Sequence, residues 1–118
     1  MHEGVLRQVS QDHSMVAELV RDGLLTPEEA RRHPYRNIIT RALGTDEWVD
    51  VDVSEIDKCA GDIYLICSDG LSEYVLEEQM QELLLEHDLE EAAERLLNLA
   101  LKGGGRDNIS LVIAEVTA

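Results

Sequence analysis

The stretch that decides the fold is IYLICSDGL, residues 63–71, where a continuous apolar run ends in a turn signal. Its first five residues are apolar and rich in strand formers, which predicts a central strand buried on both faces. The triplet Ser68-Asp69-Gly70 that follows is typical of a turn. We therefore expect the acidic side chain of Asp69 at the mouth of a buried strand.

A second stretch of the same kind, GGRDNISLVIAEV, occupies residues 104–116 and predicts a strand over residues 109–116. If the two strands are antiparallel neighbours, the end of one lies beside the start of the other, and Asp69 and Asp107 converge. Converging carboxylates beside flexible glycines suit a hard divalent cation, Mg²⁺ or Mn²⁺. The alternative is that Asp69 belongs to an ordinary turn and that Asp107 caps or turns a loop.

Apolar spacing and capping residues predict four helices, over residues 12–23, 26–33, 77–86 and 88–103. Alternation of apolar and polar residues predicts short strands over residues 5–10 and 48–53, and residues 35–44 read as a short helix or an ordered loop. The resulting order of elements predicts an α+β arrangement in which helices cover a mostly antiparallel sheet.

The charge balance narrows the choice of partners. The chain has 118 residues, enough for one domain at most, with 25 acidic and 10 basic side chains and a net charge of −15. Such a field repels phosphate backbones and anionic lipid, so no nucleic acid and no membrane surface is expected as a partner. Divalent cations and basic protein surfaces are favoured. There is no bilayer-spanning apolar run and no signal-peptide core, which predicts a cytoplasmic protein.

The two cysteines, Cys59 and Cys67, form no CxxC pair and have no histidine at ligand spacing. The pattern therefore predicts two reduced thiols, and neither a zinc site nor a disulfide.

Four stretches, read in order, resemble motifs of a known family: QDHS (11–14), HPYRNIITRALG (33–44), CSDGL (67–71) and GGRDN (104–108). They are similar to the C-terminal half of the bacterial metal-dependent (PPM, or type 2C) serine/threonine protein phosphatases. The resemblance implies part of a β-sandwich flanked by helices, and a single partial domain over residues 1–118. It also implies hydrolysis of phosphoserine and phosphothreonine by a water held between two Mn²⁺ or Mg²⁺ ions.

The resemblance assigns roles to individual residues. Asp69 and Asp107 match the two aspartates that ligate one catalytic metal, and Asp12 matches an aspartate that joins Asp69 at a third, weaker metal site. Asn108 matches an asparagine that supports a ligand by hydrogen bonding. No protein nucleophile is implied, because the metals activate the water. The implied partners are a phosphoprotein substrate and a cognate serine/threonine kinase or its targets.

The chain also departs from the family pattern. The motifs of the N-terminal half, namely a phosphate-binding arginine, an acidic motif near RxxNED and DGHGG, do not occur, and Asp22-Gly23 closes a helix. We expect a catalytically incomplete chain that is inactive alone and self-associates through uncovered sheet. The alternative is a non-catalytic, phosphatase-derived binding or regulatory module.

Overall fold

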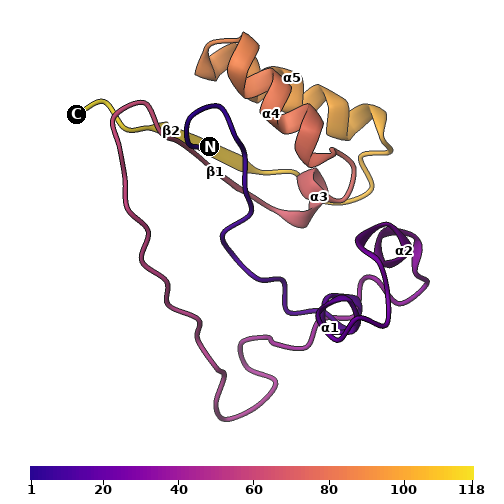
Figure 1. Ribbon diagram of the computed structural model, residues 1–118. Coiled ribbons are helices and arrows are strands. Elements are labelled where there is room, and N and C mark those ends of the chain that lie inside the picture. The colour runs from indigo at the N-terminus through magenta and orange to yellow at the C-terminus, as the bar shows by residue number, and fades with distance from the viewer. The chain divides into compact units, whose positions relative to one another are not determined.

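The computed structural model describes all 118 residues and divides into two compact units. The first unit comprises residues 1–7 and 56–118, and the second comprises residues 8–55. The elements, labelled in Figure 1, are α1 (Met15–Arg21), α2 (Pro27–Arg32), β1 (Ile63–Cys67), α3 (Asp69–Ser72), α4 (Glu77–Glu86), α5 (Leu89–Lys102) and β2 (Leu111–Glu115). No helix is both long enough and apolar enough to cross a membrane.

The sheet of the first unit consists of β1 and β2, which run antiparallel. Ile63 pairs with Glu115 at one end, and Cys67 pairs with Leu111 at the other. Both strands were predicted from their apolar runs, although β2 begins two residues later than predicted. The pairing places the carboxyl end of β1 beside the amino end of β2, where the two acidic motifs lie.

Helices cover one face of this sheet. Figure 1 shows α4 and α5 packed beside each other over the β1–β2 pair. Asp88 caps α5 by accepting a hydrogen bond from the Glu91 N–H, and Gly103 ends the helix. The core under the helices consists of Leu71, Val75, Met80, Leu96 and Ala100, and the strands add Leu65, Cys67, Leu111 and Ile113 to it.

The opposite face of the sheet is open within the first unit. Ile66 is 71% exposed and its partner Val112 is 62% exposed. The prediction that residues 63–67 are buried on both faces is therefore wrong. The apolar run does form a strand, but the two-stranded sheet has helices on one side only, so alternate residues of the run face away from the core.

The second unit is built on two capped helices. The Ser14 hydroxyl accepts a hydrogen bond from the Ala17 N–H at the start of α1. Thr26 and Glu29 form the predicted capping box at the start of α2. Residues 35–44 form an ordered loop and no helix, as one of the two alternatives predicted.

The strands predicted over residues 5–10 and 48–53 do not form. Trp48 and Val53 are 85% and 87% exposed, and near the N-terminus only an isolated bridge joins His2 to Val5. A strand requires a hydrogen-bonded neighbour and cover for its apolar face. Neither segment has both a paired strand and a covered apolar face within this chain. The alternating pattern alone was therefore not sufficient to form a strand.

Candidate metal site

The two acidic loops meet because β1 and β2 are paired. Asp69 is the first residue of α3, directly beyond the end of β1, and Asp107 lies in the loop that leads into β2. The Ser68 N–H donates to the Ser110 carbonyl at 2.9 Å, which extends the antiparallel pairing past the ends of both strands. The sequence predicted this meeting of the SDG and RDN loops, and the backbone pairing confirms it.

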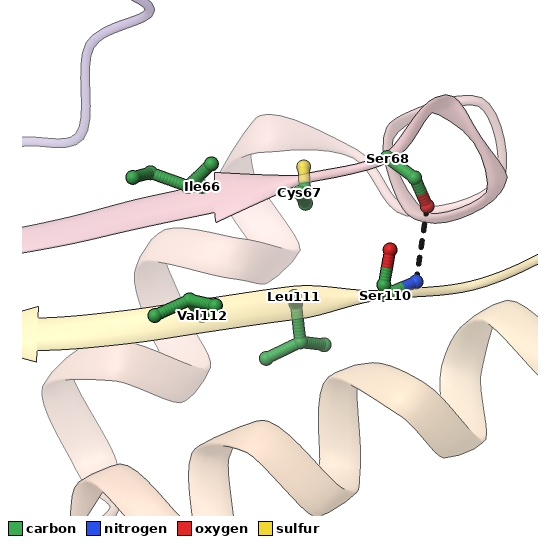
Figure 2. Close-up of a pocket in the computed structure, with 6 residues that line it drawn as sticks. All are labelled: Ile66, Cys67, Ser68, Ser110, Leu111 and Val112. Carbon is green, nitrogen blue, oxygen red and sulfur yellow. Dashed lines mark hydrogen bonds between the residues drawn. The ribbon is translucent and has the colours of Figure 1, made fainter.

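The Ser68 side chain joins the two loops a second time. Its Oγ donates to the Asn108 carbonyl at 3.1 Å and accepts from the Ser110 N–H at 3.0 Å, as the dashed line in Figure 2 shows for the latter bond. Ser68 stands at the N-cap position of α3 but does not cap that helix, because its hydroxyl is engaged across the sheet. The sequence predicted only a turn at residues 68–70 and no role for the Ser68 side chain.

Gly70 lets the two loops approach this closely. A Cβ atom at position 70 would lie 2.1 Å from the Asn108 carbonyl oxygen and 2.9 Å from the carbonyl carbon. Gly70 is buried and lies within the single helical turn of α3, so the turn predicted at residues 68–70 is in fact the start of a short helix. Its absent side chain matters here because the Asn108 backbone occupies that space.

The carboxylates themselves are accessible. Asp69 and Asp107 are both exposed, and the Asp107 Oδ1 accepts a hydrogen bond from the Asn108 N–H at 2.7 Å. Oxygen-only donors on an exposed edge, held by a firmly paired backbone, are the chemistry that Mg²⁺ and Mn²⁺ prefer, since these ions keep several waters. The residues present therefore fit a hard divalent cation. Their ligation of a metal, and a supporting role for the Asn108 side chain, remain predictions.

Asp12 belongs to the second unit. It is exposed just before α1, where its Oδ1 accepts from the Gln8 side-chain amide at 3.2 Å and its carbonyl accepts from Arg21 at 3.0 Å. Both contacts leave carboxylate oxygen free for another ligand. Its place at a third metal site stays a prediction.

An ion-pair cluster in the second unit engages the QDHS stretch. His13 Nε2 lies 2.8 Å from one Asp52 carboxylate oxygen, and Arg41 lies 2.9 Å from the other. The hydrogen bond from Arg41 holds the pKa of Asp52 below its ordinary value, and His13 adds to the effect. Asp52 therefore tethers the extended segment around residue 52 to the residues just before α1 and to the loop after α2.

These features define a class: an α+β fragment with helices over one sheet face and an acidic loop junction suited to a divalent cation. No protein-family model matches the chain. It is, however, 45% identical over 116 residues to the serine/threonine protein phosphatase PstP of Mycobacterium tuberculosis, covering 98% of this chain and 22% of PstP. It is 42% identical over 112 residues to the serine/threonine phosphatase Stp of Listeria monocytogenes, covering 94% of this chain and 44% of Stp.

Solved structures give the same relationship. The crystal structure of M. tuberculosis PstP superposes with a TM-score of 0.85 at 43% identity, covering 99% of this chain and 49% of that structure. The PstP catalytic domain in complex with two manganese ions superposes with a TM-score of 0.81 at 42% identity, covering 99% of this chain and 48% of that structure. The chain belongs to the PPM serine/threonine phosphatases, as its motifs predicted, and spans half or less of the length of these relatives.

Proposed function

We propose that this chain supplies the C-terminal, one-metal half of a phosphatase that hydrolyses phosphoserine and phosphothreonine in proteins. The observation that carries the proposal is the junction of the SDG and RDN loops, where the β1–β2 pairing, Ser68 and Gly70 hold two exposed aspartates on one edge. The proposal is also supported by the relatives PstP and Stp, both of which are serine/threonine phosphatases.

In this proposal Asp69 and Asp107 hold one Mn²⁺ or Mg²⁺ ion, and Asp12 has the role that the resemblance implies for it, as a ligand of a third, weaker site. When bound, such an ion supplies activation of water and neutralisation of phosphoryl charge. The backbone of this chain holds the two carboxylates in place relative to each other. Ser68 bonds to the Asn108 carbonyl, which ties the ligand loop before β2 to the ligand loop after β1.

The chain alone is proposed to be inactive or nearly so. Hydrolysis in a two-metal site needs a second metal and a clamp for the phosphate, and the N-terminal motifs that would provide them do not occur in this sequence. The chain also spans only 44% of Stp. We therefore expect activity to require the matching N-terminal half.

The second candidate function is a non-catalytic binding module, which the open sheet face favours. Ile66 and Val112 lie beside a surface hollow of about 300 Å³ that extends to Ser68 and Ser110, and Figure 2 shows the residues that line it. The proposed occupant of this face is the N-terminal half of such a catalytic domain, because the chain spans about half of the solved PstP structure. In its absence we expect self-association, which light scattering at increasing concentration would detect. A strictly monomeric chain would contradict that expectation.

A phosphoprotein substrate, a cognate serine/threonine kinase and a cytoplasmic location complete the proposal. Relatives that are protein phosphatases support the first of these. The kinase rests on the resemblance of the motifs, and the location rests on the sequence prediction from its apolar runs.

The proposal is tested with p-nitrophenyl phosphate and a phosphothreonine peptide in the presence of Mn²⁺. The wild-type chain is assayed alone and mixed with the N-terminal half of PstP. The Asp69→Ala and Asp107→Ala variants are then each mixed with that half in place of the wild type. Asp57→Ala serves as the control, because Asp57 is an exposed aspartate before β1. We expect turnover only in mixtures that keep both Asp69 and Asp107. Robust turnover by the chain alone that survives both substitutions would show that the site lies elsewhere.

A further inference from the structure

A second group of metal-ligating side chains lies at the opposite end of β1 from Asp69. His2, Cys59 and Asp62 each offer one ligand atom, and these three atoms lie within 4.8 Å of one another. All three residues belong to the first unit. His2 is 60 positions from Asp62, so the search for a histidine at ligand spacing along the sequence could not reveal the group.

Backbone hydrogen bonds hold the segments that carry these side chains. The Asp62 N–H donates to the Cys59 carbonyl at 3.1 Å, which closes a turn directly before β1. The His2 and Val5 backbones exchange two hydrogen bonds of 3.0 and 2.9 Å. The Ile63 N–H donates to the Met1 carbonyl at 2.9 Å and fixes the first segment against the strand. The three side chains are thus brought together by paired backbone and not by chance contact of free loops.

Asp62 is the anchor of the group. It is 6% exposed, and its two oxygens are engaged separately, Oδ1 with His2 Nδ1 at 2.7 Å and Oδ2 with the Cys59 N–H at 2.8 Å. These bonds, led by the Cys59 N–H, hold the pKa of Asp62 below its ordinary value, so the buried carboxyl is ionised at neutral pH. The Cys59 thiol is exposed and free of any disulfide, which leaves it available as a ligand.

We propose that His2, Cys59 and Asp62 form a binding site for a borderline transition-metal cation of the Zn²⁺ class, with water in the fourth position. A thiolate, an imidazole nitrogen and a carboxylate oxygen are ligands that Zn²⁺ accepts, whereas Mg²⁺ and Mn²⁺ favour oxygen alone. Zn²⁺ bonds such atoms at about 2.0–2.3 Å, which places pairs of ligand atoms about 3–4 Å apart. The three ligand atoms lie within 4.8 Å of one another, and His2 Nδ1 and Asp62 Oδ1 are 2.7 Å apart. To reach the geometry of a bound ion, these two atoms must move slightly apart while the Cys59 sulfur stays close to both.

Binding releases protons in this site. The cation displaces the proton between His2 Nδ1 and Asp62, which moves to solvent or is left on the other ring nitrogen, and the Cys59 thiol proton, which moves to solvent, because only the neutral imidazole and the thiolate are ligands. The bound cation ties the first segment of the chain to the turn before β1. Since these ligands are far apart in the sequence, we expect it to stabilise the folded first unit.

The competing explanation is a plain ion pair between His2 and Asp62 in which Cys59 has no part. Substitution of the Cys59 thiol distinguishes the two explanations. The ion pair uses the Cys59 backbone N–H and not its sulfur, so only metal binding should depend on the thiol. The first experiment therefore titrates the full, reduced chain with Zn²⁺ against a competing chelating indicator, for the wild type, Cys59→Ser and the matched control Cys67→Ser. We expect Cys59→Ser to lower Zn²⁺ affinity about tenfold or more, and Cys67→Ser to leave it unchanged.

Two further readouts keep the test independent of folding and of phosphatase activity. Co²⁺ substituted for Zn²⁺ should give a thiolate-to-metal charge-transfer absorption in the wild type and in Asp69→Ala, but not in Cys59→Ser. Zn²⁺ should raise the melting temperature of the wild type more than that of His2→Gln, whose side chain is 60% exposed and can be replaced without disturbing the core. Equal Zn²⁺ affinity of the wild type and Cys59→Ser, or a Co²⁺ spectrum without the thiolate band, would overturn the proposal. Loss of Zn²⁺ binding in Asp69→Ala would assign the metal to the other site.

Discussion

Gly70→Ala is the substitution that most directly tests how the two acidic loops are held together. The new Cβ would lie 2.1 Å from the Asn108 carbonyl oxygen, whereas real Cβ atoms essentially never approach a neighbour within 3.0 Å. The loop before β2 must therefore move by at least 0.9 Å, the difference between these two distances. The obstacle is backbone, so no side-chain rotation can relieve it. The movement separates the peptide next to Asp107 from the helix that carries Asp69.

The expected cost follows from two opposing effects. Alanine in place of glycine within a helix stabilises by about 1 kcal/mol. Overpacking a tight site costs about 1–3 kcal/mol, and a backbone obstacle places Gly70→Ala at the upper end of that range. The steric effect wins, and we expect the free energy of unfolding to fall by about 2 kcal/mol. A displacement of 0.9 Å also exceeds the tolerance of about 0.2 Å in metal–ligand distances, so Mn²⁺ affinity should fall about tenfold or more.

Urea denaturation followed by circular dichroism measures the first quantity, and calorimetric titration with Mn²⁺ measures the second. Ser72→Ala is the matched control, because Ser72 is exposed on the same short helix. The control should keep both the stability and the Mn²⁺ affinity of the wild type. If Gly70→Ala were as stable as the wild type and bound Mn²⁺ equally well, the contact with Asn108 would not be what positions the two aspartates.

Three further substitutions test other features of the structure. Ser68→Ala removes the two hydrogen bonds that its hydroxyl makes across the loops, one of them to the Asn108 carbonyl, and should cost about 1–2 kcal/mol in chemical denaturation. Leu96→Ala empties a fully buried position under the helices and should cost about 3–4 kcal/mol. Asp52→Asn removes a carboxylate whose pKa Arg41 lowers, so the melting temperature should fall at neutral pH. Because the pKa of Asp52 is lower in the folded state, its ionised carboxylate stabilises the fold at pH values above the unfolded pKa of about 3.9. This stabilisation is lost as the pH falls through the folded pKa, so the difference in melting temperature between Asp52→Asn and the wild type should vanish in acid.

Each of these has its own check. Leu97→Ala, on the same helix as Leu96 but 39% exposed, should cost clearly less, and an equal loss would mean that burial does not set the cost. A Ser68→Ala chain as stable as the wild type would show that the hydroxyl bonds add nothing to the strand pairing. A melting-temperature difference between Asp52→Asn and the wild type that persists at pH 2 would exclude the ionised carboxylate as its source.

Prediction from sequence succeeded where the deciding interactions are local. The capping box of Thr26 and Glu29 and the Asp88 cap join residues three apart, so the residues themselves specify where α2 and α5 begin. The helical apolar period of residues 89–101 likewise predicts the buried face that includes Leu96. The four motif stretches, which include those around Asp69 and Asp107, together predicted the family, because their order and spacing are properties of the sequence.

Tertiary structure decided everything that depends on which distant segments become neighbours. Residues 48–53 alternate like a strand and still form none, since no partner strand lies beside them, and Ile66 is exposed because only one sheet face is covered. The approach of Asn108 to Gly70 and the gathering of His2 with Asp62 join residues far apart in the chain. Side-chain preferences and periodicity act over a few residues, whereas these contacts arise only when remote backbone pairs. The β1–β2 pairing brings Asn108 to Gly70, and the hydrogen bond between Ile63 and Met1 brings His2 to Asp62.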